Sequence, residues 1–221
     1  MIRYLILQDL KDESKIINTY EDWGLILGHK TIPLPTAKTE LIENEGGDGT
    51  IDLTENNNDE VKYNDRVNKY PFTLVNKFAD LPEKISMIAN KIHGKRFKIF
   101  HYDDPDYYFV GRLSVNDFSV NRAKGKFVLE ATCKPYKYKK NKTYVEQEVN
   151  GISTIKLYNI RKRAIPKITA SSNMKLTFND TIISITEGTH EYLNVYLNEG
   201  LTEIIVEGTG TIKFEYQECS M

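Results

Sequence analysis

The sequence predicts a mainly β protein with one helix, divided into two domains. Three observations support this prediction. Apolar residues lie mostly in short runs or alternate with polar residues, which is typical of strands. Apolar side chains at helical spacing occur in one segment, residues 80–93. From residue 134 the composition becomes basic and rich in tyrosine, so we place a boundary between domains of residues 1–137 and 138–221.

The composition argues against several classes of protein. With 221 residues, of which 40% are hydrophobic and 11% aromatic, the chain can form packed cores. The 30 Lys and Arg and 31 Asp and Glu residues give a net charge of -1, and neither half is basic, unlike a dedicated nucleic-acid-binding protein. Apolar runs are too short for a signal peptide or a membrane span, so we expect no membrane insertion. Cys133 and Cys219 match no metal or redox spacing and indicate a reducing cytosol.

In the first domain the expected strands are short and separated by turn residues. Residues 31–36 contain two prolines, so they suit a sheet edge or a crossing segment rather than a central strand. Residues 43–59 read ENEGGDGTIDLTENNND, in which glycines allow bends, residues 50–54 form a strand, and Asn56, Asn57 and Asn58 form a tip. The other expected strands are residues 3–8, 20–27, 60–63, 70–77 and 125–131.

The predicted helix, about residues 80–93, has start and stop signals. Asp80 is a suitable N-cap, Pro82 suits the first turn, and Glu83 completes a capping box with Asp80. Gly94 follows the last turn, where glycine commonly ends a helix. A sheet must cover the apolar face, which consists of Leu81, Ile85, Ile88 and Ile92.

Turn signals organise the rest of the chain. Residues 103–106 read Asp-Asp-Pro-Asp, the signal of a type I turn between two strands. In the second domain, apolar and polar residues alternate over residues 174–178 before an Asn179-Asp180 turn. They alternate again over residues 211–216, after a predicted turn at residues 208–210. Short strands with close turns predict a small antiparallel sandwich or barrel.

The glycine- and acid-rich stretch fails as a chemical site because of its spacing. A calcium loop of the EF-hand type that begins at Asp48 requires glycine at its sixth position, where Leu53 stands. The run Gly47-Asp48-Gly49 lacks the third glycine of a dinucleotide-binding loop, and no strand-to-helix transition surrounds it. We therefore expect neither a metal nor a phosphate site there.

Two further clusters also have structural interpretations. His101 with Asp103, Asp104 and Asp106 is the densest group of metal-binding or acid–base residues, but the predicted turn explains each of them. Residues 134–142 interleave lysines with tyrosines, as a single-strand nucleic-acid binder does, but in a neutral chain we favour an interdomain linker. We therefore expect no catalytic, cofactor-binding or metal-ligating residues and no enzyme activity.

A series of motifs along nearly the whole chain is similar to one protein family. They are residues 24–27, 33–35, 46–49, 51–54, Tyr63, Arg66, residues 92–95, 103–105, 107–108, 111–112, 133–136 and 197–216. In this order they resemble the distal tail proteins of long, non-contractile-tailed bacteriophages, the hub components that join the tail tube to the baseplate or tail tip. The chain departs from the family at Glu45-Gly46, where the family often has Pro-Gly.

The resemblance implies a fold and a role. The fold is an N-terminal tail-tube-like β-barrel or sandwich followed by a C-terminal galectin-like antiparallel β-sandwich. The role is that of a structural virion protein without cofactors, located in the virion tail after assembly in the bacterial cytoplasm. The expected assembly is a homohexameric ring that joins the major tail (tube) protein to the tail-tip or baseplate hub protein and to receptor-binding proteins. DNA passes through its channel without specific binding.

By analogy with tail tube proteins, the long excursion from Pro33 to Tyr63 is expected to be an arm that reaches the neighbouring subunit. The candidate subunit-interface residues lie in its glycine–aspartate turn, in the strand that follows and at its base. They are Gly46, Gly47, Asp48, Gly49, Ile51, Leu53, Tyr63 and Arg66.

A glycan-binding module that mediates adhesion to the host cell wall is the alternative function, because galectin-like sandwiches bind sugars elsewhere. Such sites usually stack the sugar on a tryptophan, and Trp23 lies outside the second domain. Tyr192 or Tyr196 would then have to replace it, although strand tyrosines usually pack on their neighbours.

Overall fold

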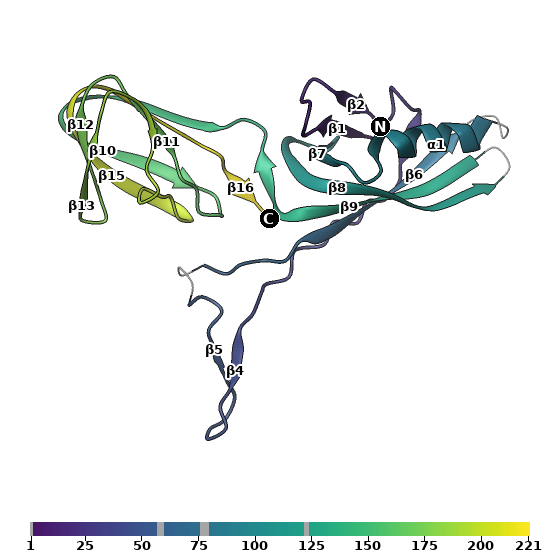
Figure 1. Ribbon diagram of the computed structural model, residues 1–221, viewed down its shortest axis with the longest axis horizontal. Coiled ribbons are helices and arrows are strands. Elements are labelled where there is room, and N and C mark those ends of the chain that lie inside the picture. Colours follow the sequence, from purple (N-terminus) through teal and green to yellow (C-terminus); the bar gives the residue numbers. More distant parts are fainter. Residues whose placement is uncertain (1, 57–59, 76–79, 122–123) are drawn as a thin grey trace. The chain divides into compact units, whose positions relative to one another are not determined.

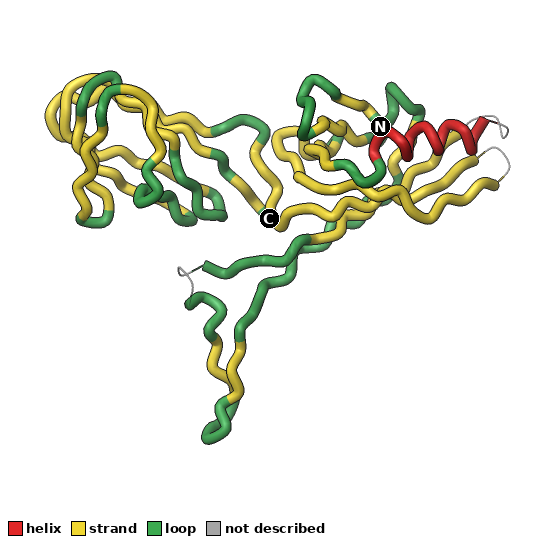
Figure 2. The backbone as a smooth tube through the Cα atoms, viewed as in Figure 1, coloured by secondary structure: helices red, strands yellow, loops and turns green. Residues whose placement is uncertain are grey.

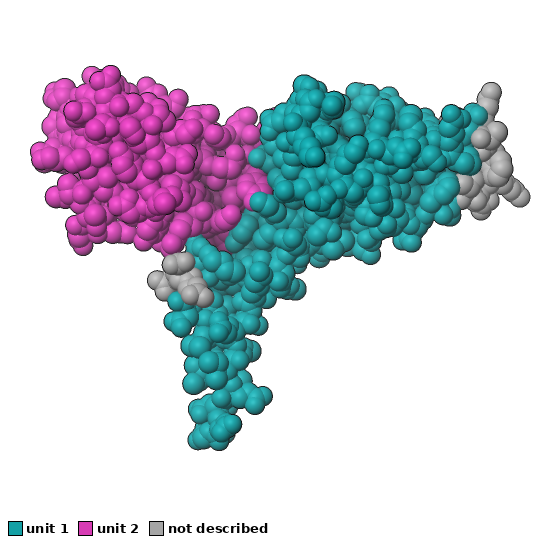
Figure 3. Space-filling view, viewed as in Figure 1, with its two compact units in different colours: residues 1–137, 221 teal, residues 138–220 magenta. Residues whose placement is uncertain are grey.

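The fold is mainly β, as predicted. The computed structural model describes residues 2–56, 60–75, 80–121 and 124–221, and these residues contain one helix, α1 (Leu81–Ile92) (Figure 1, Figure 2). The chain forms two compact units, which we call unit 1 (residues 1–137 and 221) and unit 2 (residues 138–220) (Figure 3).

Unit 1 is built on a sheet in which the strands follow the order β2-β1-β7-β8-β9-β6-β3. Strand β1 pairs antiparallel with β2 and β7, and β6 pairs antiparallel with β3 and β9. The bounds are β1 (Leu5–Asp9), β2 (Ile16–Asn18), β3 (Leu25–Leu27), β6 (Arg66–Val75), β7 (Arg96–His101), β8 (Asp104–Asn121) and β9 (Lys124–Lys139).

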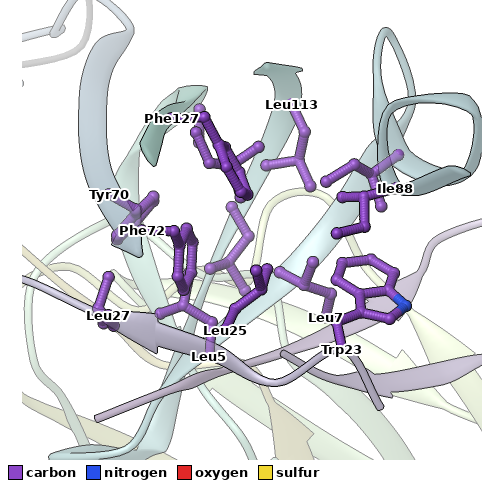
Figure 4. Packing of buried hydrophobic residues seen from close by; sticks show 14 of the residues in the cluster. Leu5, Leu7, Trp23, Leu25, Leu27, Tyr70, Phe72, Ile88, Leu113 and Phe127 are labelled. Atoms are coloured by element: carbon purple, nitrogen blue, oxygen red, sulfur yellow. The ribbon is translucent and has the colours of Figure 1, made fainter. Parts of the chain in front are cut away.

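The core of unit 1 lies between this sheet and α1. The helix buries the predicted apolar face of Leu81, Ile85, Ile88 and Ile92. Figure 4 shows side chains of the helix and of the strands gathered in the same core, which contains Trp23. The helix approaches β9 closely at Gly125, where an added Cβ would lie 3.3 Å from a methyl carbon of Leu81. The spacing of apolar residues in the sequence therefore predicted correctly which face of the helix packs on the sheet.

The predicted capping box of α1 is not formed. Asp80 has helical backbone angles (φ -92°, ψ -10°) and makes no side-chain hydrogen bond to the helix. An N-cap normally adopts extended angles, which aim its side chain at the free amides of the first turn. The start of the helix is favoured instead by Pro82 and by the burial of Leu81. At the other end, Gly94 has a φ of +75°, as expected for a glycine after a helix.

Several predicted strands of unit 1 have different bounds, since residues 3–8 become β1 at Leu5–Asp9 and residues 125–131 become β9 at Lys124–Lys139. Residues 20–27 form a strand only from Leu25, because the Gly24 amide donates to the Tyr20 carbonyl (2.7 Å) and closes a turn first. Residues 60–63 are not a strand, and Tyr63 forms an isolated bridge to Ala37. Strand β6 begins at Arg66 rather than at residue 70 and ends at Val75. Asn76 and Lys77 lie outside the described residues.

The hairpin between β7 and β8 turns earlier than predicted. Tyr102 and Asp103 form the loop, because His101 pairs with Asp104. The next pair is Phe100 with Tyr108, so Pro105 lies in an irregular part of β8 where the register shifts. Proline has no amide hydrogen for the ladder, and within sheets it is tolerated at such bulges.

Unit 2 is an antiparallel β structure built around one long ladder. Strands β10 (Thr143–Asn159) and β15 (Gly200–Tyr216) pair along their whole length. Strands β11 and β12 also pair with β15, and β13 and β14 extend the sheet. The remaining bounds are β11 (Lys167–Ala170), β12 (Met174–Phe178), β13 (Thr181–Ile185), β14 (Gly188–Glu191) and β16 (Cys219–Ser220).

Residues 208–210 lie inside β15 and do not form the predicted turn. Gly208 faces Gly151 of β10 across the ladder. Its φ is +157°, and an added Cβ would lie 2.8 Å from the Cγ of Met174. These glycines therefore let a continuous strand pass close to its neighbour. The predicted strand at residues 211–216 is the end of β15. The predicted linker is also partly strand, because β9 continues to Lys139.

The predicted Asn179-Asp180 turn is confirmed. It joins β12 to β13 between the paired residues Phe178 and Thr181. Both loop residues have positive φ, +46° for Asn179 and +59° for Asp180, as a type I′ turn requires.

We predict that Asp180→Gly stabilises unit 2. Glycine adopts a φ of +59° without the clash that a Cβ introduces, and Asn-Gly is a favoured type I′ pair. The left-handed conformation costs a non-glycine residue roughly 1–2 kcal/mol, and the greater entropy loss of glycine offsets part of this difference, so the expected gain is about 0.5–1 kcal/mol in the free energy of unfolding. It is measured by urea unfolding followed by circular dichroism. Thr177→Gly, inside the neighbouring strand, is the matched control and is expected to destabilise the unit. A lower stability of Asp180→Gly would contradict the prediction.

Candidate subunit-interface arm

The excursion expected from the sequence forms an extended hairpin, which we call the arm (residues 37–63, described except for 57–59). Its two strands are β4 (Leu41–Glu43) and β5 (Thr50–Asp52), and they pair with each other. At its base the Lys38 amide donates to the Lys62 carbonyl (2.8 Å). Residues 36–52 are exposed, and Figure 1 shows β4 and β5 standing away from the other strands of unit 1.

The glycine–aspartate turn is the tip of this hairpin. Gly46, Gly47, Asp48 and Gly49 lie in the loop between β4 and β5. The amide of Gly46 donates to the side-chain oxygen of Asn44 (3.3 Å), and Gly49 has a φ of +80°, which favours glycine. The expected tip at Asn56 is therefore misplaced, because Asn56 lies in a turn after β5. Asn57 and Asn58 lie outside the described residues.

One face of the arm is apolar, and no described residue of the chain covers it. Ile42 and Ile51 are direct partners across the ladder, so their side chains share a face. They are 48% and 51% exposed. Leu53, whose amide donates to the Glu40 carbonyl (2.8 Å), continues this face toward the base. A two-stranded hairpin is at best marginally stable alone in water, so this face favours burial against another surface.

The arm is also strongly acidic. Between Thr39 and Asn56 the sequence has no lysine, arginine or histidine, and its acidic residues are Glu40, Glu43, Glu45, Asp48, Asp52 and Glu55. These six negative charges in a chain of net charge -1 leave +5 for all other residues (-1 + 6 = +5). Hydrogen bonds from the side chain and the amide of Thr54 lower the pKa of Asp52 and so keep it ionised. A surface that binds the arm must therefore tolerate or neutralise negative charge.

The two remaining candidate residues lie at the root of the arm. Tyr63 bridges to Ala37 and makes an edge-to-face contact with Tyr136, with 5.9 Å between ring centroids. Arg66 is buried in β6, and its Nη1 donates to the carbonyl of Pro33 (3.3 Å) where the chain leaves for the arm. Its guanidinium carbon lies 4.3 Å from the ring centroid of Phe109.

The burial of Arg66 distinguishes it from the residues of the tip. Its Nε and Nη2 have no hydrogen-bond partner among the described residues, and burial lowers the pKa of the guanidinium. A side chain that is only 4% exposed cannot offer a large contact to another copy. The structure thus divides the predicted residues into an exposed tip and strand and a buried anchor.

The residues of the His101 cluster make structural contacts within unit 1. His101 is buried and shares a hydrogen bond of 2.9 Å between its Nε2 and the Tyr70 hydroxyl. Asp103 pairs with Lys30, and Asp104 pairs with Lys137 (2.7 Å). In the part of the chain that the structure describes, no group of three or more His, Cys, Asp or Glu residues is placed to hold a metal. These ion pairs give Asp103, which lies in the loop, and Asp104, which begins β8, a structural role.

The two cysteines are free and buried. Burial raises the pKa of the Cys133 thiol to about 12 and also raises that of Cys219. A thiol reacts as its thiolate, so these side chains lack the environment of a reactive cysteine.

Within the described ranges, the one helix is too short and too polar to cross a membrane.

Comparisons with known proteins support the fold. No family model and no curated protein matches the sequence. Among solved structures, the crystal structure of the Dit (gp 19.1) protein of phage SPP1 matches with a TM-score of 0.71, 12% identity and 100% coverage of both chains. It is described as a paradigm of the hub adsorption apparatus in phages that infect Gram-positive bacteria. The predicted resemblance to distal tail proteins is therefore confirmed at the level of the fold.

Weaker matches come from phage P2. Chains of its baseplate, in the activated conformation with Ca and with Sr, match with a TM-score of 0.47 each. Their identities are 8% and 7%, and each match covers 99% of this chain and 98% of the other.

We predict that His101 makes unit 1 sensitive to acid. Burial, and next the charge of Lys30, lower its pKa from 6.5 to about 3. Because the unfolded state binds the proton more strongly, stability present above pH 6.5 is lost as the pH falls toward 3, by about 1.4 kcal/mol per pH unit. His101→Gln is expected to reduce the pH dependence of unfolding by about this amount.

The measurement is urea unfolding from pH 8 to pH 3.5, followed by the fluorescence of Trp23. This is the chain's one tryptophan, and it lies in the core of unit 1. At pH 8, His101 is neutral in both the folded and the unfolded state. The difference in unfolding free energy between the original chain and His101→Gln at this pH therefore measures the effect of the substitution itself. Equal pH dependence in both proteins would contradict the prediction.

Proposed function

We propose that the chain is a structural protein of a bacteriophage tail, the hub that joins the tail tube to the baseplate or tail tip. The observation that carries this proposal is the match in fold to the SPP1 Dit protein over the full length of both chains. A fold can host several functions, so the arm provides the second support. A monomeric enzyme or transport protein has no need of an exposed, acidic hairpin with an uncovered apolar face.

The proposed assembly is a homohexameric ring formed by unit 1. The outermost strands of its sheet, β2 and β3, have three residues each, which limits how much a neighbouring sheet can gain by pairing with them. The arm is longer and wholly exposed over residues 36–52, so it offers the larger contact. In this proposal each arm reaches the next copy, and the head-to-tail contact closes after six copies.

The ring encloses a channel through which DNA passes during ejection. DNA that must slide should not be held by many lysine or arginine contacts to its phosphates. A chain of net charge -1 is consistent with this requirement. One face of the ring joins the major tail protein, and the other joins the tail-tip or baseplate hub protein and the receptor-binding proteins. The protein is assembled in the bacterial cytoplasm and is located in the virion tail.

Contacts within unit 2 disfavour the alternative of glycan binding. Tyr196 is engaged by Phe178, at 5.2 Å between ring centroids, and by the guanidinium of Arg163, 4.2 Å from its ring centroid. Tyr192 packs against the core and lies 6.0 Å from the ring of His190. Both tyrosines therefore pack on neighbouring side chains, although they lie in the segment after β14 and not in a strand. The side chain of His101 and the two thiols are buried, so we assign the chain no enzymatic role.

We predict that removing the arm prevents ring formation without unfolding the subunit. The variant lacks residues 41–52 and joins Glu40 to Leu53 through Asn-Gly. The Leu53 amide already donates to the Glu40 carbonyl (2.8 Å), so a two-residue turn can connect these two residues. Because the removed residues are exposed, the unfolding midpoint reported by Trp23 is expected to stay unchanged. Native mass spectrometry and negative-stain images should show a hexameric ring for the full chain and monomers for the variant. A ring of six from the variant would refute the arm's role.

A further inference from the structure

Unit 1 contains a groove of about 880 Å³ between α1 and the segment that joins β1 to β2. Its apolar lining consists of Ile16, Ile17, Met87 and Phe97. Met87 is 38% exposed and Ile16 is 58% exposed, although both are large apolar side chains. The groove is therefore an apolar surface that the subunit leaves open.

The charges around the groove are arranged along the helix. Lys91, in the last turn of α1, and Lys95, just after it, line one end. Among the described residues neither lysine forms an ion pair, and the Lys95 ammonium donates to the Asn90 carbonyl (3.2 Å). Glu83, in the first turn, lines the other end, about 12 Å away at the helical rise of 1.5 Å per residue. The Lys15 and Asp9 side chains also line the groove. One end thus attracts acidic groups and the opposite end repels them.

The tip of the arm is complementary to the lysine end of the groove, although Glu40 and Glu55 make the base of the arm acidic as well. The apolar pair of the arm, Ile42 and Ile51, is followed toward the tip by Glu45 and Asp48. If the apolar pair lies on Met87 and Ile16, the acidic tip reaches toward Lys91 and Lys95 when it points away from Glu83. The spacing agrees, since Lys91 is one helical turn from Met87 and the loop starts two residues after Ile42.

We propose that the occupant of this groove is the arm of a second copy of the chain, seated with its Ile42–Ile51 face inward and its acidic tip at Lys91 and Lys95. The proposal rests on the proposed ring and specifies its subunit contact. The groove and the arm in one chain do not serve each other, because no arm residue lines the groove and residues 36–52 are exposed. The contact is heterologous, so each copy gives one arm and receives one, as a ring requires.

Cysteine cross-linking tests the seat of the arm. The full-length variants Ile51→Cys and Met87→Cys, carrying different tags, are mixed under mild oxidation. The native Cys133 and Cys219 are buried and do not compete. The proposal predicts a disulfide-linked pair that contains one copy of each variant. Leu41→Cys is the matched control, because Leu41 is also exposed but pairs with Asp52 on the opposite face of the arm. It should cross-link to Met87→Cys much less.

A charge exchange tests the orientation. The double variant Lys91→Glu, Lys95→Glu is expected to weaken the ring, so that rings dissociate at a protein concentration about tenfold higher. The double variant Glu45→Lys, Asp48→Lys should have the same effect. A copy that carries all four changes should regain assembly, because the charges are again opposite. Lys84→Glu, on the same helix but not lining the groove, is the control and should leave assembly unchanged. Trp23 fluorescence checks that each variant is folded.

The outcomes separate this inference from the proposed function. Rings with selective Ile51–Met87 cross-links and restored assembly in the exchanged variant support the inference. If the full chain forms rings but Leu41→Cys cross-links as well as Ile51→Cys, or the exchange restores nothing, the groove is not the seat and the proposed ring stands. If the full chain forms neither rings nor cross-links, both are overturned.

Discussion

The arm cannot bury its own apolar face, and this constraint links its sequence, its root and its proposed role. A hairpin with three residues in each strand holds Ile42 and Ile51 side by side but has no third strand or helix to cover them. Such a surface in a water-soluble chain is stable only if the contact it makes compensates for its exposure. In the proposed ring, the six acidic residues of the arm restrict which surface can accept it.

The root shows how the subunit keeps such a hairpin in place. Tyr63 and Ala37 form the last bridge of the arm, and Arg66 reaches from inside β6 to the carbonyl of Pro33. Burying a guanidinium whose Nε and Nη2 lack hydrogen-bond partners among the described residues is costly, and the contact with the Phe109 ring offsets part of this cost. Interactions of this kind fix where the arm leaves the sheet. A fixed exit direction lowers the entropy that a contact with a neighbouring copy must overcome.

Glycines have two different roles in the two units. At the arm tip, Gly49 supplies a positive φ that reverses the chain. In β15, Gly208 lets a strand that continues for several residues pass Met174 without a clash. The sequence alone predicts a turn at both positions, because glycine permits many backbone conformations and does not specify whether the chain reverses. The partner strand β10 decides between them by pairing with β15 from end to end.

The sequence by itself determined what depends on neighbours within a few residues. It gave the apolar face of α1, the Asn179-Asp180 turn and the exposed character of the arm, because helical spacing and turn chemistry are local. The order of its motifs also indicated the fold that the SPP1 match supports. Tertiary structure alone decided the ends of β6 and β15, the loop at Tyr102 and Asp103, and the burial of Arg66 and His101. Strand ends and burial are set by which distant segment lies alongside, and no local pattern encodes that partner.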